Sequence, residues 1–295
     1  MPILTNNLGL PDAFVKSVSN DDYDKGLSDI TVTQLISPPR AVALYRQYED
    51  QVTEDVEDRL YLLLGKAVHQ ILETADKSAL SERLYMKIDN WTLGGLTDHI
   101  EVDELSDAWK IKDYKCTSIH TINPDFNNGK SYKKEWEQQL NIYAQLFRSN
   151  GFDVSSLSII AFFRDYSKLQ RERLGYLKAP VQEIAIPLWS EDKALSFIRE
   201  KISLHKNLVD KEQKDLPLCT EEERWARATT YAIMKDGVQK ARKVLKSKSA
   251  AEDYLDKYHT NQKNMYIETR PGKSIKCDDY CSVNTFCTQY QNTKG

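Results

Sequence analysis

The chain has 295 residues, of which 40% are hydrophobic and 29% are charged, and its formal net charge at pH 7 is −3. These values are typical of a globular protein. They exclude a protein that covers a nucleic acid with a uniformly basic surface, but they are compatible with a local basic groove. No apolar run is long enough to span a bilayer, and the amino terminus lacks a basic segment followed by an apolar one. We therefore expect a cytoplasmic protein without a membrane segment or signal peptide.

The amino-terminal part of the chain predicts a helical or irregular segment followed by a long helix. Residues 1–55 are predicted as the helical or irregular segment, of which residues 1 to about 30 are polar and acidic. Residues from about 56 to 75 have helical periodicity. Within this helix Gly65, His69 and Glu73 lie four residues apart, near one face. Gly65 is expected to let another backbone approach that face closely. A lone helical histidine is more often a core or surface residue than a ligand, so His69 becomes a candidate ligand only together with the strands that follow.

Three strands are predicted after this helix. Alternation of apolar and polar residues predicts the first strand over residues 82–89 and the second over residues 96–102. The polar residues 103–107 interrupt the pattern, which resumes over residues 108–115. The second and third strands are therefore predicted to form a hairpin.

Three charged side chains lie in line with the apolar positions of this hairpin. Because side chains alternate between the faces of a strand, Asp98 shares a face with Ile100. On the next strand Asp113 and Lys115 share a face with Ile111. Taken alone, the three charges are compatible with a surface ion pair. Since a buried charge must be paired or bound to a metal, their alignment with the core positions favours a divalent-cation site beside a lysine.

A further helix and two strands complete the predicted core. The helix runs from about residue 132 to 150, with Gln139 and Tyr143 one turn apart on the same face. This pair is either the polar edge of an ordinary amphipathic helix or a hydrogen-bonding pair that contacts a phosphate or the lysine. Residues 154–164 and 181–187 are predicted strands. The core order is therefore a helix, three strands, a helix and a strand, followed by the further strand over residues 181–187.

Four short motifs in these elements resemble, in chain order, those of the PD-(D/E)xK nuclease superfamily, and within it the RecB-type exonuclease domains. They are Gly65-x-x-x-His69, Gly95-Leu96-Thr97-Asp98, Asp113-Tyr114-Lys115 and Gln139-x-x-x-Tyr143. The resemblance covers about residues 60–165, and four motifs in order with compatible spacing are fairly specific. It implies an α/β, restriction-endonuclease-like core, a mixed central sheet flanked by helices, over residues 56–190.

The resemblance also implies roles for these residues. In that family the histidine and both acids hold Mg²⁺ or Mn²⁺, which here assigns His69, Asp98 and Asp113 as ligands. The lysine positions or activates the attacking water, and the glutamine and tyrosine orient the site and contact DNA. These roles pass to Lys115, Gln139 and Tyr143, listed here as catalytic residues together with Asp98 and Asp113. Many members carry Glu where this chain has Asp113, and both side chains bind hard cations.

The implied function is a metal-dependent deoxyribonuclease that hydrolyses phosphodiester bonds. The resemblance favours an exonuclease on single-stranded DNA or duplex ends in recombination, repair or phage DNA metabolism, in a bacterium or a phage-infected host cell. The alternatives are a catalytically silent DNA- or protein-binding module with a nuclease fold, and an endonuclease subunit of a larger complex. The chain has no G-x-x-x-x-G-K-[ST] motif, so unwinding is expected to come from a helicase or recombination partner.

Residues 191–295 are predicted to form a helical extension. Thr220 followed by Glu223 fits a capping box that opens a helix. Between residues 235 and 248 six Lys or Arg residues oppose one Asp. This basic segment is either a surface that follows a DNA backbone or the solvated face of a helix.

Cysteines near the carboxyl end predict a metal or iron–sulfur site. Cys277, Cys281 and Cys287 are closely spaced, and with Cys219 they make a plausible four-thiolate set, although free core cysteines are the alternative. Thiolates suit either Zn²⁺ or an iron–sulfur cluster, and the spacing does not decide between them. The resemblance favours [4Fe–4S], because several CRISPR-associated and AddB-type members carry such a cluster closed by a carboxyl-terminal cysteine trio. In many of them the fourth cysteine precedes the nuclease motifs, whereas here Cys219 follows them and Cys116 is expected to be a core residue.

Overall fold

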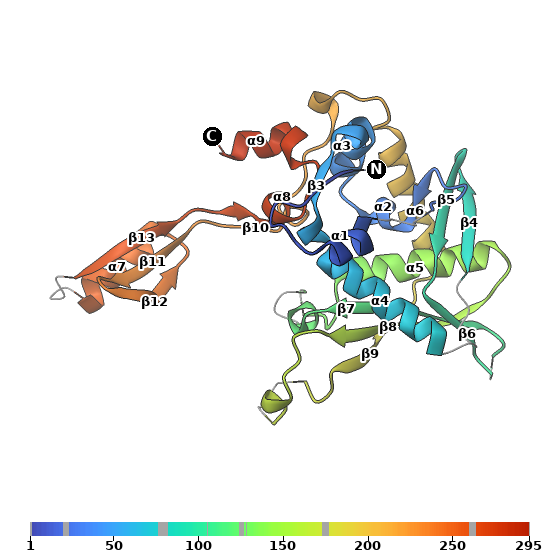
Figure 1. The fold of residues 1–295 in the computed structure, drawn as a ribbon, viewed down its shortest axis with the longest axis horizontal. Helices are drawn as coiled ribbons and strands as arrows, with labels where there is room; N and C mark the ends of the chain where they lie inside the picture. The colour runs from blue at the N-terminus through green and yellow to red at the C-terminus, as the bar shows by residue number, and fades with distance from the viewer. Residues whose placement is uncertain are drawn as a thin grey trace. The chain divides into compact units, whose positions relative to one another are not determined.

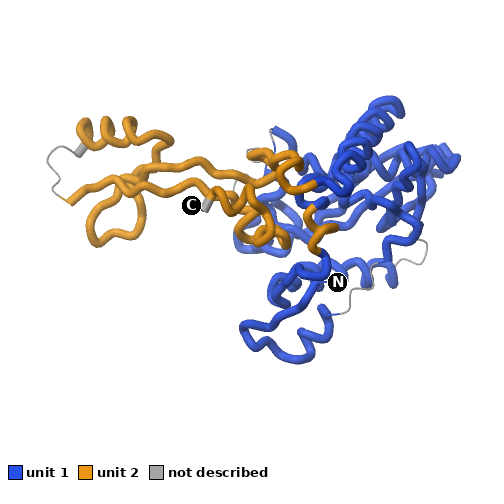
Figure 2. The backbone as a smooth tube through the Cα atoms, turned by 90° about the horizontal axis from the view of Figure 1, so that it is seen from above, with its two compact units in different colours: residues 1–43, 49–211 blue, residues 44–48, 212–295 orange. Residues whose placement is uncertain are grey.

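The computed structural model describes the chain except residues 1, 20–23, 76–81, 105, 124–126, 128, 173–176, 260–263 and 295. It divides into two compact units, which are coloured separately in Figure 2. Unit 1 comprises residues 1–43 and 49–211, and unit 2 comprises residues 44–48 and 212–295. The fold is mixed α/β, as the sequence predicted. Among the described helices, none combines the length and the apolar character needed to cross a membrane.

A four-stranded mixed sheet lies in unit 1. In spatial order its strands are β6 (His99–Val102), β7 (Trp109–Thr117), β8 (Val154–Phe163) and β9 (Val181–Ile186). β7 and β8 are parallel, whereas β6 pairs antiparallel with β7 and β9 pairs antiparallel with β8. The predicted hairpin is confirmed as the β6–β7 pair, although residue 105 of its turn lies outside the described residues. The two later predicted strands are confirmed as β8 and β9.

A second sheet of unit 1 shows where the strand prediction failed. In spatial order it contains β2 (Ile30–Thr31), β5 (Trp91–Leu96) and β4 (Arg83–Ile88). β4 is the predicted strand over residues 82–89, but the single strand predicted over residues 96–102 was wrong. β5 ends at Leu96, β6 begins at His99 in the other sheet, and Thr97 and Asp98 link the two. Alternation alone did not reveal this change of sheet, because polar and apolar residues continue to alternate through the link.

Two long helices complete the core of unit 1 (Figure 1). They are α5 (Lys134–Ser149), which is the predicted helix over residues 132–150, and α6 (Glu191–Lys206). The side chains of α5 from Leu140 to Phe147 are buried, and they share one hydrophobic cluster with sheet residues and with Ile198 of α6. α6 therefore belongs to unit 1, whereas the sequence placed it in the carboxyl-terminal extension that begins at residue 191.

The rest of unit 1 surrounds this core. The predicted helix over residues 56–75 begins as a 3₁₀ turn, Val56–Arg59, and continues as α4. The first 55 residues, predicted as helical or irregular, also contain a parallel strand pair. The helices are α1 (Asp12–Ser19), α2 (Val32–Ile36), α4 (Leu60–Ala75) and the first half of α3 (Pro39–Tyr48), whose residues 44–48 belong to unit 2. The paired strands are β1 (Ile3–Thr5) and β3 (Thr53–Asp55).

Unit 2 contains more strand than the sequence predicted. Its antiparallel sheet has the spatial order β12 (Val238–Leu245), β11 (Thr230–Lys235) and β13 (Met265–Arg270), and α7 (Lys248–His259) packs on it. A shorter ladder joins β10 (Ala226–Arg227) to β14 (Lys273–Ser274), and the chain ends with α8 (Ile275–Asp279) and α9 (Thr288–Lys294). The prediction of a helical extension was therefore wrong for most of residues 226–274.

The capping box predicted at Thr220 forms without the helix. The Thr220 amide donates to Oε2 of Glu223 at 2.8 Å, and the Glu223 amide donates to the Thr220 hydroxyl at 3.1 Å. Only a turn follows, and Trp225 has a φ of 50°. That left-handed conformation does not continue a right-handed helix, so the chain leaves the turn as β10.

Candidate active site

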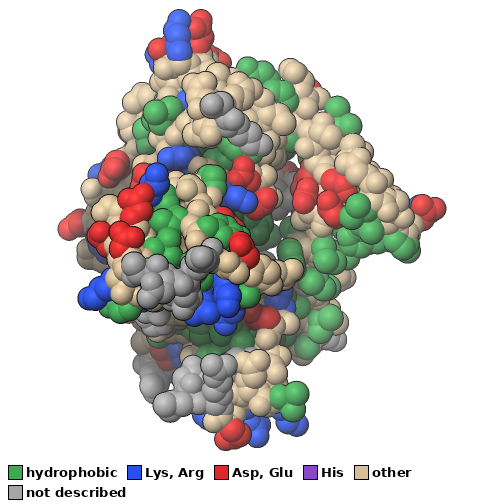
Figure 3. Space-filling model, turned by 90° about the vertical axis from the view of Figure 1, so that its left-hand side faces the viewer, with side chains coloured by type: hydrophobic (Ala, Val, Ile, Leu, Met, Phe, Trp, Pro, Cys, Tyr) green, Lys and Arg blue, Asp and Glu red, His purple; other side chains and the backbone are tan. Residues whose placement is uncertain are grey.

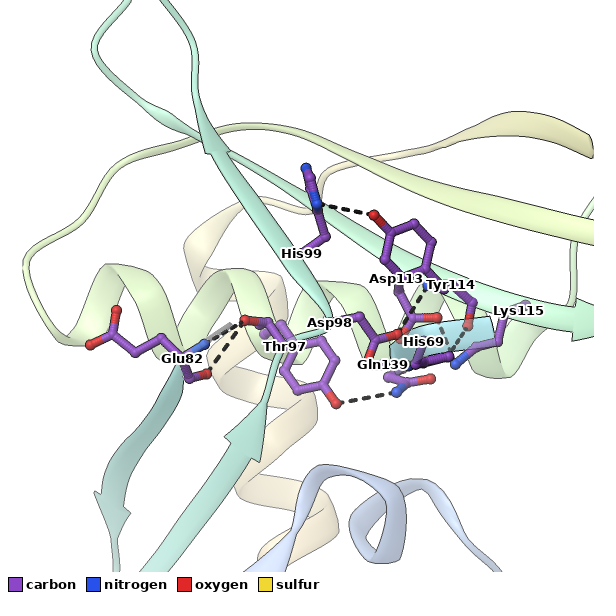
Figure 4. A network of polar contacts seen from close by, with 10 residues as sticks. His69, Glu82, Thr97, Asp98, His99, Asp113, Tyr114, Lys115 and Gln139 are labelled. Atoms are coloured by element: carbon purple, nitrogen blue, oxygen red, sulfur yellow. Dashed lines mark hydrogen bonds and ion pairs between the residues drawn. The ribbon is translucent and has the colours of Figure 1, made fainter. Parts of the chain in front are cut away.

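Three elements of unit 1 bring His69, Asp98 and Asp113 toward one another (Figure 4). His69 comes from α4, Asp98 from the link between the two sheets and Asp113 from the middle of β7. Nδ1 of His69 lies 3.4 Å from Oδ1 of Asp98. The charge of Asp113 also acts on the pKa of His69, so the three side chains occupy one small region.

The backbone of Tyr114 contacts the side chains of both His69 and Asp98. Its amide donates to Oδ2 of Asp98 at 3.0 Å, and its carbonyl oxygen lies 3.1 Å from Nε2 of His69. The β6–β7 ladder ends where His99 pairs with Lys112, so Asp98 supplies the acceptor that a neighbouring strand provides elsewhere. In a neutral imidazole the contact with the carbonyl places the proton on Nε2 and leaves the Nδ1 lone pair facing Asp98.

Asp113 is buried, with 2% of its side chain exposed, and Lys115 is its ionic partner. Nζ of Lys115 lies 2.6 Å from Oδ2 of Asp113. No described residue donates a hydrogen bond of regular geometry to that buried oxygen. Lys115 therefore compensates the charge of this carboxylate, whose further lone pairs can also accept a cation.

The same arrangement shifts the pKa values of the buried pair. Burial raises the pKa of Asp113 to about 6, against the opposing charge of Lys115. Burial lowers the pKa of Lys115, but the charges of Asp113 and Asp98 outweigh that effect and raise it above its usual value. Lys115 is therefore an ammonium group at neutral pH, next to a carboxyl group that loses its proton only shortly below neutrality.

The pKa values of His69 and Asp98 move apart because the two side chains interact. The hydrogen bond with Asp98 raises the pKa of His69, although burial lowers it. Burial raises the pKa of Asp98, but its hydrogen bond and charge interaction with His69 outweigh burial and hold the pKa below its usual range. Asp98 is therefore ionised at neutral pH and ready to bind a cation.

The residues present fit Mg²⁺ or Mn²⁺, since both ions accept carboxylate oxygens and leave positions for water. Two ligands at right angles on an ion with bonds of about 2.1 Å are about 3 Å apart. The 3.4 Å between His69 Nδ1 and Asp98 Oδ1 is close to that separation. Within the described parts of the chain, no group of three or more His, Cys, Asp or Glu side chains has the arrangement of a formed metal site. The possible metal ligands His69 and Asp98 are therefore a close pair, and Asp113 lies beside them (Figure 4).

Gln139 and Tyr143 contact each other on α5. Nε2 of Gln139 donates to the Tyr143 hydroxyl at 3.2 Å. The ring of Tyr143 packs against Gly95 of β5, where an added Cβ would lie 2.6 Å from Cε1 of Tyr143. A methyl group there would also come within 2.9 Å of Leu146. Glycine at position 95 therefore lets α5 lie close to β5 at the level of this pair.

The other motif glycine has a different environment. A Cβ on Gly65 would meet nothing within 4 Å, so the expected close approach of another backbone at that position was wrong. The helix around it, α4, has no fully buried side chain in the structure, and Glu73 is exposed. Its exposed apolar side chains are Leu60, Tyr61, Leu62, Leu64 and Ile71.

The two motif glycines make a matched pair for a stability test. We expect Gly95→Ala to lower the free energy of unfolding by about 1–3 kcal/mol, because the added methyl group overpacks the interface with α5. Gly65→Ala is expected to raise it by about 0.5–1 kcal/mol, because alanine favours the helix and the site is open. Urea unfolding followed by circular dichroism measures both. Equal effects of the two substitutions would contradict the packing described here.

A network on the opposite face of β7 was not predicted from the sequence. The Tyr114 hydroxyl lies 3.0 Å from Nδ1 of the buried His99, and Nε2 of His99 lies 3.5 Å from Glu101. Lys112 lies 3.0 Å from the same glutamate. Tyr114 is thus fixed by its side chain on one face and holds His69 and Asp98 through its backbone at the other. The sequence signal was only that Tyr114 stands between Asp113 and Lys115.

The four cysteines of the predicted cluster all lie in unit 2. Cys287 is buried, and Cys219, Cys277 and Cys281 are half-buried. Burial, together with the charges of Glu223 and the other three cysteines, raises the pKa of Cys219 to about 12. Burial also raises the pKa values of Cys277 and Cys281. The thiols thus disfavour one another's ionisation, but among the described residues no three of these side chains have the arrangement of a formed metal site.

Side-chain amides hold the cysteine segments together. Gln289 accepts a hydrogen bond from the Cys219 amide and donates one to the Cys219 carbonyl, both at 2.8 Å. Gln213 makes the same double contact with the main chain, donating to Phe286 at 2.7 Å and accepting from Thr288 at 3.0 Å. Asn284 donates to the Cys277 carbonyl at 2.8 Å. We call these three residues the amide clamps. Cys116 lies on β7 in unit 1.

Comparisons with known proteins add little to this geometry. A scan against models of protein families and a search of curated proteins both found no match. A solved structure titled "Crystal structure of SSO0001" is similar, with a TM-score of 0.42 and 17% sequence identity over 69% of this chain and 88% of that chain. A similarity at this level carries no argument about fold or function, so the functional argument rests on the residues described above.

Proposed function

We propose that the protein is a metal-dependent deoxyribonuclease that hydrolyses phosphodiester bonds, acting as an exonuclease on single-stranded DNA or duplex ends. One observation carries the proposal. Residues from a helix, an inter-sheet link and a strand place an imidazole and two carboxylates together, and the buried carboxylate of Asp113 lies 2.6 Å from the ammonium group of Lys115. The ordered motifs noted in the sequence point to the same chemistry.

In this proposal His69, Asp98 and Asp113 hold Mg²⁺ or Mn²⁺. The bound ion supplies charge stabilisation at the scissile phosphate and lowers the pKa of a bound water. Lys115, whose pKa is raised, is charged at neutral pH and acts by donating hydrogen bonds that position water or phosphate. Gln139 and Tyr143 orient the site from α5.

The cysteines of unit 2 are proposed to hold a structural [4Fe–4S] cluster through Cys219, Cys277, Cys281 and Cys287, with Zn²⁺ as the alternative. Thiols that raise one another's pKa lose their protons at neutral pH only when a strongly binding cation replaces the protons. The amide clamps support this proposal, because they gather the cysteine segments without help from a metal.

A cleavage assay on matched DNA substrates tests the proposed function. Purified protein with Mn²⁺ is incubated with end-labelled linear and with circular DNA, each single-stranded and double-stranded. An exonuclease degrades the linear forms and leaves the circles intact, and an endonuclease opens the circles. A protein that cleaves none of the four substrates with Mn²⁺ or Mg²⁺ would be a silent module, and the proposal would fail.

Metal binding is expected to depend on pH through Asp113. The metal needs the carboxylate, and the pKa of Asp113 is about 6, so binding is fully available above that value and is lost as pH falls through it. Mn²⁺ should therefore raise Tm clearly at about pH 8 and much less at about pH 5. Differential scanning fluorimetry measures both shifts. Asp113→Asn is the control and should respond at neither pH, whereas equal shifts at both pH values in the unmodified protein would contradict the assignment.

A further inference from the structure

The basic segment of residues 235–248 is a strand and its flanks, not the helix face considered from the sequence. Asp236 and Gly237 lie near its start, and Gly237 has a φ of 74°. Because Lys235 pairs with Val238, Asp236 and Gly237 form the tight turn between β11 and β12. The six Lys or Arg residues of the segment thus follow one edge of the unit 2 sheet and its two ends.

The basic side chains at the centre of this segment have no acidic partners. We call them the basic edge: Lys240, Arg242, Lys243 and Lys246. All four are exposed, and none has an ion pair within the described residues. Elsewhere in the same sheet and helix such pairs do form, since Arg270 lies 2.6 Å from Glu268 and Lys248 lies 3.7 Å from Glu252. The charge of the basic edge is therefore left for a partner outside the chain.

The position of these residues on an edge strand matters for the kind of partner. β12 lies at one end of the sheet order, and successive side chains point to opposite faces. Arg242 and Lys243 therefore flank the edge from both faces, an arrangement that follows a linear polyanion along the strand.

Protection against strand-to-strand aggregation is the simpler reason for lysine on an edge. The opposite edge of the same sheet provides the comparison. β13 carries one basic residue, Arg270, which is paired with Glu268. The two edge strands of one sheet thus differ in charge, and edge protection by itself does not require the four basic residues on and beside β12.

We propose that the basic edge binds the sugar–phosphate backbone of a nucleic acid. Charge complementarity carries the proposal, because four exposed cations stand unpaired in a chain whose net charge is −3. The choice of DNA as the nucleic acid rests on the proposed nuclease function. The contacts are to phosphates, so binding is independent of base sequence and strongly dependent on salt.

The experiment replaces all four residues of the basic edge by glutamine in the full-length protein. Binding to fluorescein-labelled single-stranded and duplex DNA of about 20 nucleotides is followed by fluorescence anisotropy in EDTA, between about 50 and 200 mM salt. We expect affinity at low salt to fall at least about tenfold and the slope of log K against log salt to fall by about 2 to 4 units. A charge-retaining variant, with arginine at the three lysines, is expected to bind like the unmodified protein.

A control variant changes the net charge equally at exposed basic residues of unit 1. Its substitutions are Lys16→Gln, Lys87→Gln, Lys168→Gln and Arg199→Gln. Equal loss of binding in both variants, or an unchanged slope in a basic-edge variant with unchanged circular dichroism, would overturn the proposal. Equal loss of binding to polyglutamate would also overturn it, because the edge would then take any polyanion.

The outcomes for the basic edge and for the nuclease separate cleanly. Binding is measured in EDTA, without cleavage, so loss of binding in the basic-edge variant supports the edge even if no DNA is ever cut. If the basic-edge variant binds DNA normally and still cleaves it, the proposed role of the basic edge is wrong and the nuclease proposal is unaffected.

Discussion

Asp113→Asn and Lys115→Met are each expected to reduce Mn²⁺-dependent DNA cleavage by at least about a thousandfold, the scale of losing one preorganised electrostatic group. The asparagine keeps the shape of Asp113 but removes the negative charge that the proposed ion requires. The methionine fills the space of the Lys115 stem but removes the ammonium group 2.6 Å from Asp113. Single-turnover cleavage of end-labelled single-stranded DNA measures both losses.

Lys112→Met is the matched control, because it removes a lysine from the same strand on the opposite face. Lys112 contacts Glu101 and Glu183, at 3.0 and 3.8 Å, and touches none of the proposed ligands. Its variant should keep activity within about threefold, the loss of a weak, partly exposed ion pair. Circular dichroism of all three proteins establishes that they are folded. Full activity in the folded Lys115→Met or Asp113→Asn protein would remove the basis of the nuclease proposal.

Replacing a cluster cysteine by serine is expected to release the cluster and destabilise unit 2. The unmodified protein, purified without oxygen, should be brown and hold about four irons per chain. Cys281→Ser should lose most of the iron, and its Tm should fall by more than roughly 10 °C, because a metal site that closes a small unit contributes several kcal/mol to its folding. Iron analysis, absorption spectroscopy and thermal unfolding measure these effects.

Cys116→Ser is the control for this experiment. Cys116 is half-buried on β7 in unit 1, so its variant should keep the colour and the iron. Loss of iron from Cys116→Ser with full retention in Cys281→Ser would reverse the ligand assignment. A colourless protein loaded with zinc after anaerobic purification would refute the iron–sulfur proposal and leave the zinc alternative.

The elements with strong periodicity were predictable from the sequence. α5 and β8 were found within a few residues of their ends, since each presents a continuous apolar pattern to one core. The β6–β7 hairpin was found because polar residues interrupt two alternating runs. Local pattern was sufficient wherever an element packs against a single neighbour.

The change of sheet was not predictable in this way. Alternation continues through Thr97 and Asp98, although β5 pairs with β4 before it and β6 pairs with β7 after it. The alternating pattern of a strand does not specify which neighbour it pairs with. The basic segment was interpreted either as a surface that follows a DNA backbone or as the solvated face of a helix, and its central part is the strand β12. The Asp236-Gly237 dipeptide, a short and specific hairpin signal, was the feature that indicated a strand.

For the candidate site, the charged residues were predictable from the sequence, but the groups that hold them in position were not. His69 and Asp98 were selected by motif, and the structure places them 3.4 Å apart. The backbone of Tyr114 and the amide clamps were not foreseen. Main-chain contacts and glutamine side chains leave no periodic or compositional mark in a sequence, so only coordinates reveal them.

The position of Asp98 between two sheets has a consequence for the timing of activity. The two-residue link of Thr97 and Asp98 has a fixed conformation only when β5 and β6 are both paired in their sheets. His69 reaches Asp98 only when α4 also packs in place. A nascent chain, or one in which either sheet has opened, keeps its proposed ligands dispersed. The proposed cleavage of DNA would then require the completely folded chain.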